Sequence, residues 1–242
     1  SVQNQTSFCA HGKNYAGAYL GIRDVFQQLE GALVWQRELS REKIVNALNY
    51  ILKDGRPPRM FSIPDSPEKP VPLDLEKYID QGNWIISTVY TYLAFTDDWS
   101  ILDEKCDYLA APDNEDWADG VKTGERTTVL EHLVRICDFL LSNIDTEYTN
   151  CLKVLFGDWN DAVDGLGDTD DEGKQFGTGV TVMASLQLRK NLFEMLEITA
   201  AAGKYTENAE KYKKAIEGIN AGLDKFAVDT DKNRNRRIVH GW

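Results

Sequence analysis

The predicted fold follows most clearly from one stretch of the chain, Val129-Leu-Glu-His-Leu-Val-Arg-Ile-Cys-Asp-Phe-Leu-Leu141. Apolar side chains recur in this stretch every three or four residues, which is the spacing of one face of an α-helix. The same spacing recurs on both sides of it, whereas the alternating pattern of strands is weak and short. The helical spacing predicts further helices at about 22–39, 40–52, 82–95, 99–109, 180–202 and 206–227. The sequence therefore predicts an all-α fold.

Long loops follow alternate helices in this prediction. Six of the seven prolines fall within residues 57–72, and a second loop, rich in glycine and aspartate, covers residues 157–179. Helical hairpins with their long loops at one end are typical of an (α/α)6 toroid, and seven helices fit a four-helix bundle poorly. Six hairpins close such a toroid, and this chain stops at the apolar segment 237–242. Residues 1–242 are therefore expected to be part of one incomplete (α/α)6 barrel domain.

Composition and charge exclude several classes of function. With 27 Lys and Arg against 39 Asp and Glu, the net charge is −12, so a nucleic-acid partner is not expected. No apolar run approaches the roughly 18 residues of a membrane span, so no membrane partner is expected. Three His and four scattered Cys, without CxxC or HExxH, predict no metal site. Reduced, mostly buried thiols and the lack of a visible signal peptide favour the cytoplasm.

The segment Gly157-Asp-Trp-Asn-Asp161 carries the strongest chemical signal in the chain. Trp159 offers an apolar ring for a sugar to stack on, and Asp158, Asn160 and Asp161 offer polar groups for its hydroxyls. A carboxyl group beside an indole is also disfavoured in its charged form, as a general acid requires. Two alternatives stay open at this point. The segment could be a solvated acidic loop with Trp159 as a core anchor, or a calcium loop, although the ligand spacing of an EF-hand is incomplete.

Two weaker clusters repeat this combination of residue types. Arg23-Asp24, at the start of a predicted helix, could hold a substrate hydroxyl or phosphate, or could simply complement the helix N-terminus. Asp80-Gln-Gly-Asn-Trp84 again places a carboxylate, an amide and an indole at a helix entrance. Each cluster is weak alone, but three of them at the same ends of the predicted hairpins are more than chance would give.

These motifs resemble the inverting glycoside phosphorylases of the cellobiose and chitobiose phosphorylase family. The resemblance covers about residues 15–242 and rests on three blocks in order: Arg23-Asp24 with Gln27, Asp80 to Trp84 continuing to Glu104, and Gly157 to Asp161. Two positions depart from the family pattern. Gln28 stands where the family usually has Asp, and the segment 173–179 replaces a Gly-Glu-Ser-like segment, which suggests a substrate other than cellobiose.

The resemblance implies a function and a set of site residues. It implies a catalytic (α/α)6 barrel fragment in which Asp161 is the general acid, Trp159 forms a wall of the sugar subsite, and Arg23 and Asp24 hold the sugar or the phosphate. The substrate-binding set expected from the motifs and the resemblance together is Arg23, Asp24, Asp80, Trp84, Asp158 and Trp159.

The expected reaction is cleavage of a β-linked glucooligosaccharide by inorganic phosphate to give α-glucose 1-phosphate, without a cofactor and in a possible homodimer. Phosphate is already charged and needs no catalytic base, so one acid suffices. An inverting hydrolase, which would take its base from Asp24, Asp80 or Asp158, is one alternative. The other is a non-catalytic carbohydrate-binding module.

Overall fold

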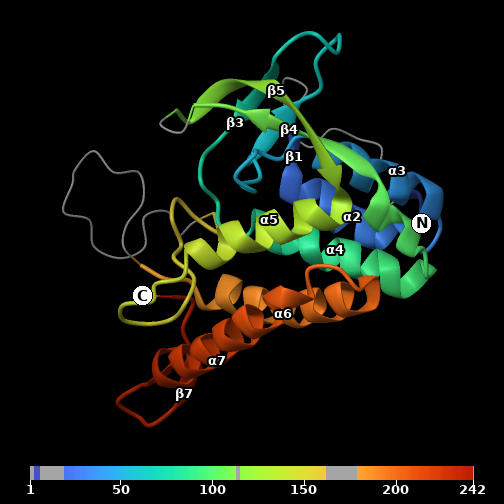
Figure 1. The fold of residues 1–242 in the computed structure, drawn as a ribbon. Coiled ribbons are helices and arrows are strands. Elements are labelled where there is room, and N and C mark those ends of the chain that lie inside the picture. The colour runs from blue at the N-terminus through green and yellow to red at the C-terminus, as the bar shows by residue number, and fades with distance from the viewer. Residues whose placement is uncertain (1–2, 6–18, 113–114, 162–178, 242) are drawn as a thin grey trace. The chain divides into compact units, whose positions relative to one another are not determined.

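A computed structural model describes residues 3–5, 19–112, 115–161 and 179–241 (Figure 1). Cys9 and the segment 173–178, which the sequence singled out, lie outside these ranges. The chain divides into two compact units, residues 1–76 with 84–137 and residues 77–83 with 138–242. No helix in the described ranges combines the length and the apolar character needed to span a bilayer.

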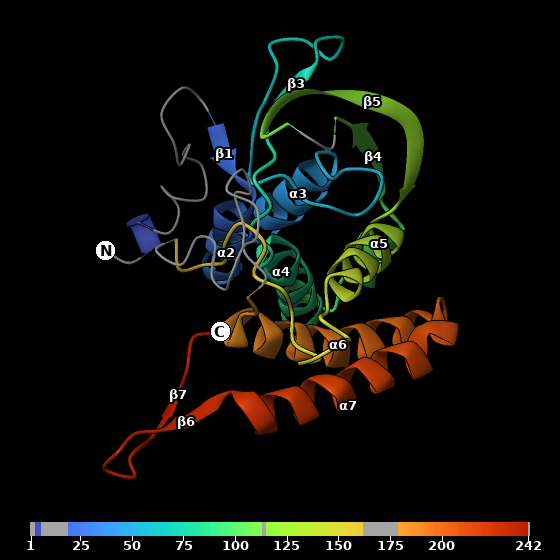
Figure 2. The same cartoon turned by 90° about the vertical axis from the view of Figure 1, so that its left-hand side faces the viewer.

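The first unit joins a helical hairpin to an antiparallel sheet. Strand β1 (Tyr19–Gly21) leads directly into α2 (Ile22–Ala32), which packs beside α3 (Arg37–Leu48) (Figures 1 and 2). The sheet has the order β1-β2-β3-β5-β4 and every neighbouring pair is antiparallel. Its other strands are β2 (Met60–Ser62), β3 (Val71–Asp74), β4 (Lys105–Ala110) and β5 (Trp117–Thr128).

This sheet shows that the prediction of an all-α (α/α)6 toroid is wrong. The proline-rich segment, expected to be a loop, contains β2 and β3. The helix expected at about 99–109 is a short 3-10 helix, Trp99–Asp103, followed by β4. These strands pair with segments far away in the sequence, so their stability comes from partners that local periodicity does not report.

The first unit is held together by contacts between the sheet and the helices. Asn49, at the end of α3, accepts a hydrogen bond from the Asp107 backbone N–H of β4 at 2.8 Å. His132 of α5 (Val129–Ser142) is buried, stacks on Tyr108 with ring centroids 3.9 Å apart, and contacts the Asp107 carbonyl through Nε2 at 3.1 Å. Burial lowers the pKa of His132. This histidine therefore has a structural role.

The second unit is built on two long helices. α6 (Val182–Ala202) and α7 (Ala209–Phe226) lie side by side, and the hairpin β6 (Val228–Thr230) and β7 (Arg236–Ile238) extends from the end of α7 (Figure 2). Gly203 ends α6 with φ of 62°, the left-handed conformation that glycine adopts without strain. Helix α4 (Gln81–Thr96) begins in this unit and continues in the first, and α5 begins in the first and ends in this one.

Three cysteines fall within the described ranges, and all three are buried free thiols: Cys106, Cys137 and Cys151. Burial raises the pKa of Cys106 to about 12. Because the thiolate is the reactive form, this thiol is inert at neutral pH.

Gly55→Ala is expected to destabilise the protein far more than Gly124→Ala. Both glycines have positive φ, 89° and 77°, but a Cβ at Gly55 would lie 2.1 Å from the Arg135 carbonyl oxygen, whereas one at Gly124 would meet nothing within 4 Å. Gly124→Ala therefore adds only backbone strain, about 1–2 kcal/mol. Gly55→Ala adds a backbone clash and should lower the free energy of unfolding by at least about 4 kcal/mol. Urea unfolding of the two variants measures both losses of stability. Equal unfolding midpoints would contradict the close approach of Gly55 to the Arg135 carbonyl.

Asp74→Asn is expected to gain stability relative to the wild type as the pH rises. Burial raises the pKa of Asp74 to about 6, although the Arg59 guanidinium lies 3.3 Å from its carboxylate. Because the unfolded pKa is about 3.9, the folded protein binds this proton more tightly, and that stabilisation is complete below pH 4 and lost by about pH 6. Between pH 4 and 7 the difference in unfolding free energy should change by about 3 kcal/mol. A constant difference would show that Asp74 titrates normally.

Candidate active site

The segment Gly157–Asp161 follows one of two strand-like segments in the second unit. Tyr78 forms a parallel bridge with Gly157, and the Ile79 N–H donates to the Gly157 carbonyl at 2.9 Å. Tyr78 also forms an antiparallel bridge with Leu155, so the two segments meet at Tyr78, shortly before Asp80 in one segment and Asp158 in the other. Asp80 follows one segment, and Asp158 with Trp159 follows the other.

Asp158 fixes the shape of the turn that comes next. Its side chain is fully buried, and its Oδ1 accepts a hydrogen bond from the Asn160 backbone N–H at 2.8 Å. Its Oδ2 accepts one from Thr181 Oγ1 at 2.6 Å and lies 2.9 Å from His240 Nε2. A buried carboxylate is stable when several donors surround it, and such charge-assisted hydrogen bonds are stronger than neutral ones. Asp158, Asn160, Thr181 and His240 are called the Asp158 network below.

Thr181 and His240 reach Asp158 because two backbone segments pair beside it. Thr181 is the N-cap of α6, where its Oγ1 also accepts from the Ala184 N–H at 3.2 Å. The Val182 N–H donates to the His240 carbonyl at 2.8 Å, and Thr181 forms a bridge with Gly241. The start of α6, the turn at Asn160 and the segment around His240 therefore meet at one carboxylate.

Trp159 and Asp161 project outward from this fixed turn. The Trp159 side chain is 55% exposed and Asp161 is exposed. The alternative in which Trp159 is a core anchor is therefore wrong. An exposed indole can stack on the apolar face of a sugar ring, and the carboxyl group two residues later can exchange a proton with a sugar oxygen.

The cluster Asp80–Trp84 lies at the start of α4. Asp80 and Asn83 are fully buried, and the Asn83 Nδ2 donates to the Ala184 carbonyl of α6 at 3.2 Å. Trp84 is half-buried one residue later. Asn83 therefore joins the beginning of α4 to the same turn of α6 that Thr181 caps.

Arg23 and Asp24 occupy the first turn of α2, with the backbone of Gly21 at the N-cap position. Arg23 is 8% exposed and Asp24 is half-buried. Both residues, and Trp84, belong to the first unit, whereas Asp80, Asp158, Trp159 and Asp161 belong to the second. The structure thus places Asp80, Asp158, Trp159 and Asp161 within one unit.

The sequence analysis missed Thr181 and His240. Thr181 carries a local signal, because a threonine just before an apolar helical stripe is a typical N-cap. His240 carries none, since its contact depends on pairing between segments about 60 residues apart in the chain. Within the described residues, no group of three or more His, Cys, Asp or Glu side chains could hold a metal ion.

Comparison with known proteins gives these motifs a context. The chain is 29% identical to solabiose phosphorylase of Paenibacillus borealis over 216 residues, which is 89% of this chain and 25% of that protein. The chain thus spans about a quarter of the length of this curated relative. Its fold is similar to that of a metal-independent α-mannosidase of Streptococcus pneumoniae, with a TM-score of 0.64 and 13% identity over 99% of this chain and 61% of the mannosidase chain.

The family model described as the glycosyl hydrolase 94 superfamily, catalytic domain, matches residues 3–239, which is almost the whole chain. That match includes Asp158, Asn160 and Thr181 and the exposed pair Trp159 and Asp161, while His240 lies one residue beyond it. The resemblance to glycoside phosphorylases drawn from the motifs is confirmed at this level. The chain belongs to the catalytic domain of the glycosyl hydrolase 94 superfamily.

Proposed function

We propose that the full protein is an inverting glycoside phosphorylase that cleaves a β-linked glucooligosaccharide with inorganic phosphate, and that residues 1–242 form part of its catalytic domain. Family membership and a phosphorylase relative support the general class. One observation carries the proposal further. The buried Asp158 holds a turn from which an exposed indole and an exposed carboxyl group, two residues apart in sequence, project outward.

Asp161 is the general acid in this proposal. It donates its proton to the glycosidic oxygen as the bond from that oxygen to the anomeric carbon breaks. A phosphate oxygen attacks the same carbon from the opposite face, so a β-linkage gives α-glucose 1-phosphate. Phosphate arrives already charged, and the reaction needs no base and no cofactor.

The other site residues bind and position in this proposal. Trp159 stacks on a sugar ring. Arg23 and Asp24, in the first unit, bind a sugar hydroxyl or the phosphate. Trp84, near the start of α4, is a further sugar-binding residue, and Asp80, which is fully buried, acts by positioning. Asp158, being buried beneath the turn, acts by holding Trp159 and Asp161 in place. The proposal includes a homodimer, supported by the family resemblance, and a cytoplasmic location, supported by the buried free thiols.

Phosphate dependence tests the proposal. The full-length protein is incubated with a panel of β-linked glucooligosaccharides, with and without inorganic phosphate, and sugar 1-phosphate and free sugar are measured. Phosphate-dependent release of α-glucose 1-phosphate supports the proposal and identifies the linkage. Release of free sugar at the same rate without phosphate would overturn it in favour of an inverting hydrolase. Binding without any product would favour a carbohydrate-binding module.

A further inference from the structure

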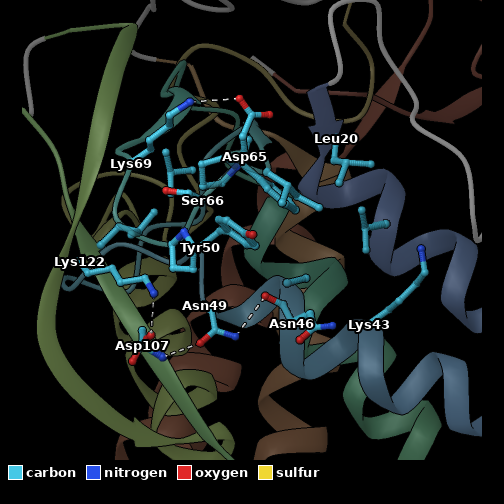
Figure 3. Close-up of a pocket in the computed structure, with 18 of the residues that line it drawn as sticks. Leu20, Lys43, Asn46, Asn49, Tyr50, Asp65, Ser66, Lys69, Asp107 and Lys122 are labelled. Carbon is cyan, nitrogen blue, oxygen red and sulfur yellow. Dashed lines mark hydrogen bonds and ion pairs between the residues drawn. The ribbon is translucent and has the colours of Figure 1, made fainter.

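The first unit contains a pocket of about 620 Å³ between α3, the start of α2 and the sheet (Figure 3). A volume of 300–1,000 Å³ is typical of small-molecule sites. Its walls come from Leu20 and Val25, the exposed side of α3, the segment between β2 and β3, and residues of β4 and β5. This pocket is called the α3 pocket.

One wall of the α3 pocket is a polar face of a single helix. Lys43, Asn46 and Tyr50 lie at positions i, i+3 and i+7, so an ammonium, an amide and a phenol follow one another along α3 and its end. Figure 3 shows all three side chains at the hollow. Tyr50 is held in place by Phe61, with ring centroids 4.0 Å apart and planes inclined by 18°.

Another wall is apolar and consists of Ile63, Pro64, Pro67 and Val71. A pyranose ring has the matching character, since its C–H groups form an apolar face and its hydroxyls lie at the edge. A ring placed between the two walls would turn its face to the prolines and its hydroxyls to Asn46 and Tyr50.

The charges around the α3 pocket distinguish Lys43 from the other lysines. Lys69 is paired with Asp65 at 3.2 Å, and Lys122 lies 3.7 Å from Asp107. No ion pair within 4 Å is recorded for Lys43 in the part of the chain that the structure describes. Burial lowers the pKa of Lys43, and the negative charge of the neighbouring Glu42 offsets this only in part. An anion bound at Lys43 would restore the stability of its charged form.

The α3 pocket lies on the side of α2 opposite Arg23, whereas Asp24 is only about 40° around the helix from Gln28 and lies on the pocket side. Successive residues of an α-helix are rotated by about 100°, so Val25 and Gln28, which line the pocket, lie about 140–160° around the helix from Arg23. Arg23 and the pocket are therefore on opposite sides of α2. A ligand in the pocket would not occupy the position of the sugar hydroxyl or phosphate on Arg23.

We propose that the α3 pocket is a second ligand site that binds a phosphorylated sugar. The phosphate contacts the Lys43 ammonium, the hydroxyls contact Asn46 and Tyr50, and the ring lies against Ile63, Pro64 and Pro67. This inference does not depend on the proposed catalytic function, because it concerns binding at a different set of residues.

Calorimetric titration of the full-length protein with glucose 6-phosphate tests the inference, because this compound is neither substrate nor product of the proposed reaction. One molecule is expected to bind per chain. Lys43→Met should weaken binding at least tenfold, since a charge-assisted contact is lost, and Tyr50→Phe should weaken it by a smaller factor. Glucose and inorganic phosphate, titrated separately, should each bind more weakly than the combined ligand.

Lys105→Met is the matched control, because Lys105 is an exposed lysine of the same unit that does not line the pocket. It should bind glucose 6-phosphate as the wild type does, and so should Asp161→Asn. Absence of binding at millimolar concentration, or equal loss in Lys43→Met and Lys105→Met, would overturn the inference. Unchanged affinity in a folded Lys43→Met variant would do the same. Equal affinity for glucose would overturn the assignment of an anionic ligand.

Discussion

Asp161→Asn in the full-length protein is expected to lower kcat by about 100- to 10,000-fold while sugar binding is retained. The substitution keeps the size of the side chain and removes the proton that the leaving oxygen needs, and general acid catalysis contributes factors of this order. Asp161 is exposed and lies outside the Asp158 network, so the fold should be unaffected. Steady-state kinetics and a direct binding titration of the same oligosaccharide separate the two effects.

Asp138→Asn is the matched control for this experiment. Asp138 is an exposed carboxylate of the second unit that pairs with Lys211 at 2.6 Å, so its loss should leave kcat within a factor of about two. If Asp161→Asn retained wild-type kcat, the proposed acid would be wrong. If it lost binding and turnover equally, Asp161 would be a binding residue.

Asp158→Asn is expected to reduce both stability and activity. The amide group would place N–H donors where Asn160, Thr181 and His240 already donate, so at least one buried hydrogen bond to a charged group is lost, at about 2–4 kcal/mol. The turn that carries Trp159 and Asp161 would then shift. Because misplacement by about 1 Å can cost about 100-fold in rate, kcat/KM should fall by this order.

Two further variants distinguish positioning from a general loss of stability. Thr181→Val keeps the shape of the side chain and removes its contacts with both Asp158 and Ala184, so it should reduce stability and kcat together. His240→Gln retains a donor for Asp158, whereas His240→Ala does not. The two variants should have similar thermal stability, and kcat should be higher for His240→Gln. Equal kcat in the two His240 variants would show that the contact with Asp158 does not position the turn.

The helices could largely be predicted from the sequence because their signal is local. The apolar face of residues 129–141 needs no knowledge of distant segments, and the corresponding helix, α5, is present at Val129–Ser142. The sheet could not be predicted in this way. β5 has the sequence WADGVKTGERTT, without an alternating apolar pattern, and it becomes a strand because it lies between β3 and β4.

The candidate site likewise has local features that the sequence indicated and long-range contacts that it did not. Residue types alone suggested that Trp159 and the polar groups around it could bind a sugar, with a core anchor as the alternative for Trp159, and its exposure removes that alternative. They did not indicate that Asp158 would be buried beneath the turn, nor that His240 would contact it. Both depend on the pairing of residues 180–182 with the segment around residue 240, which joins distant parts of the sequence.

The Thr181 hydroxyl accepts a hydrogen bond from the Ala184 N–H and donates one to Asp158. The first turn of α6 and the turn at Asn160 are therefore coupled through this one hydroxyl. Local unfolding should involve both turns as one cooperative unit. The positions of Trp159 and Asp161 should therefore fluctuate little, because their turn is tied to α6, a helix of 21 residues.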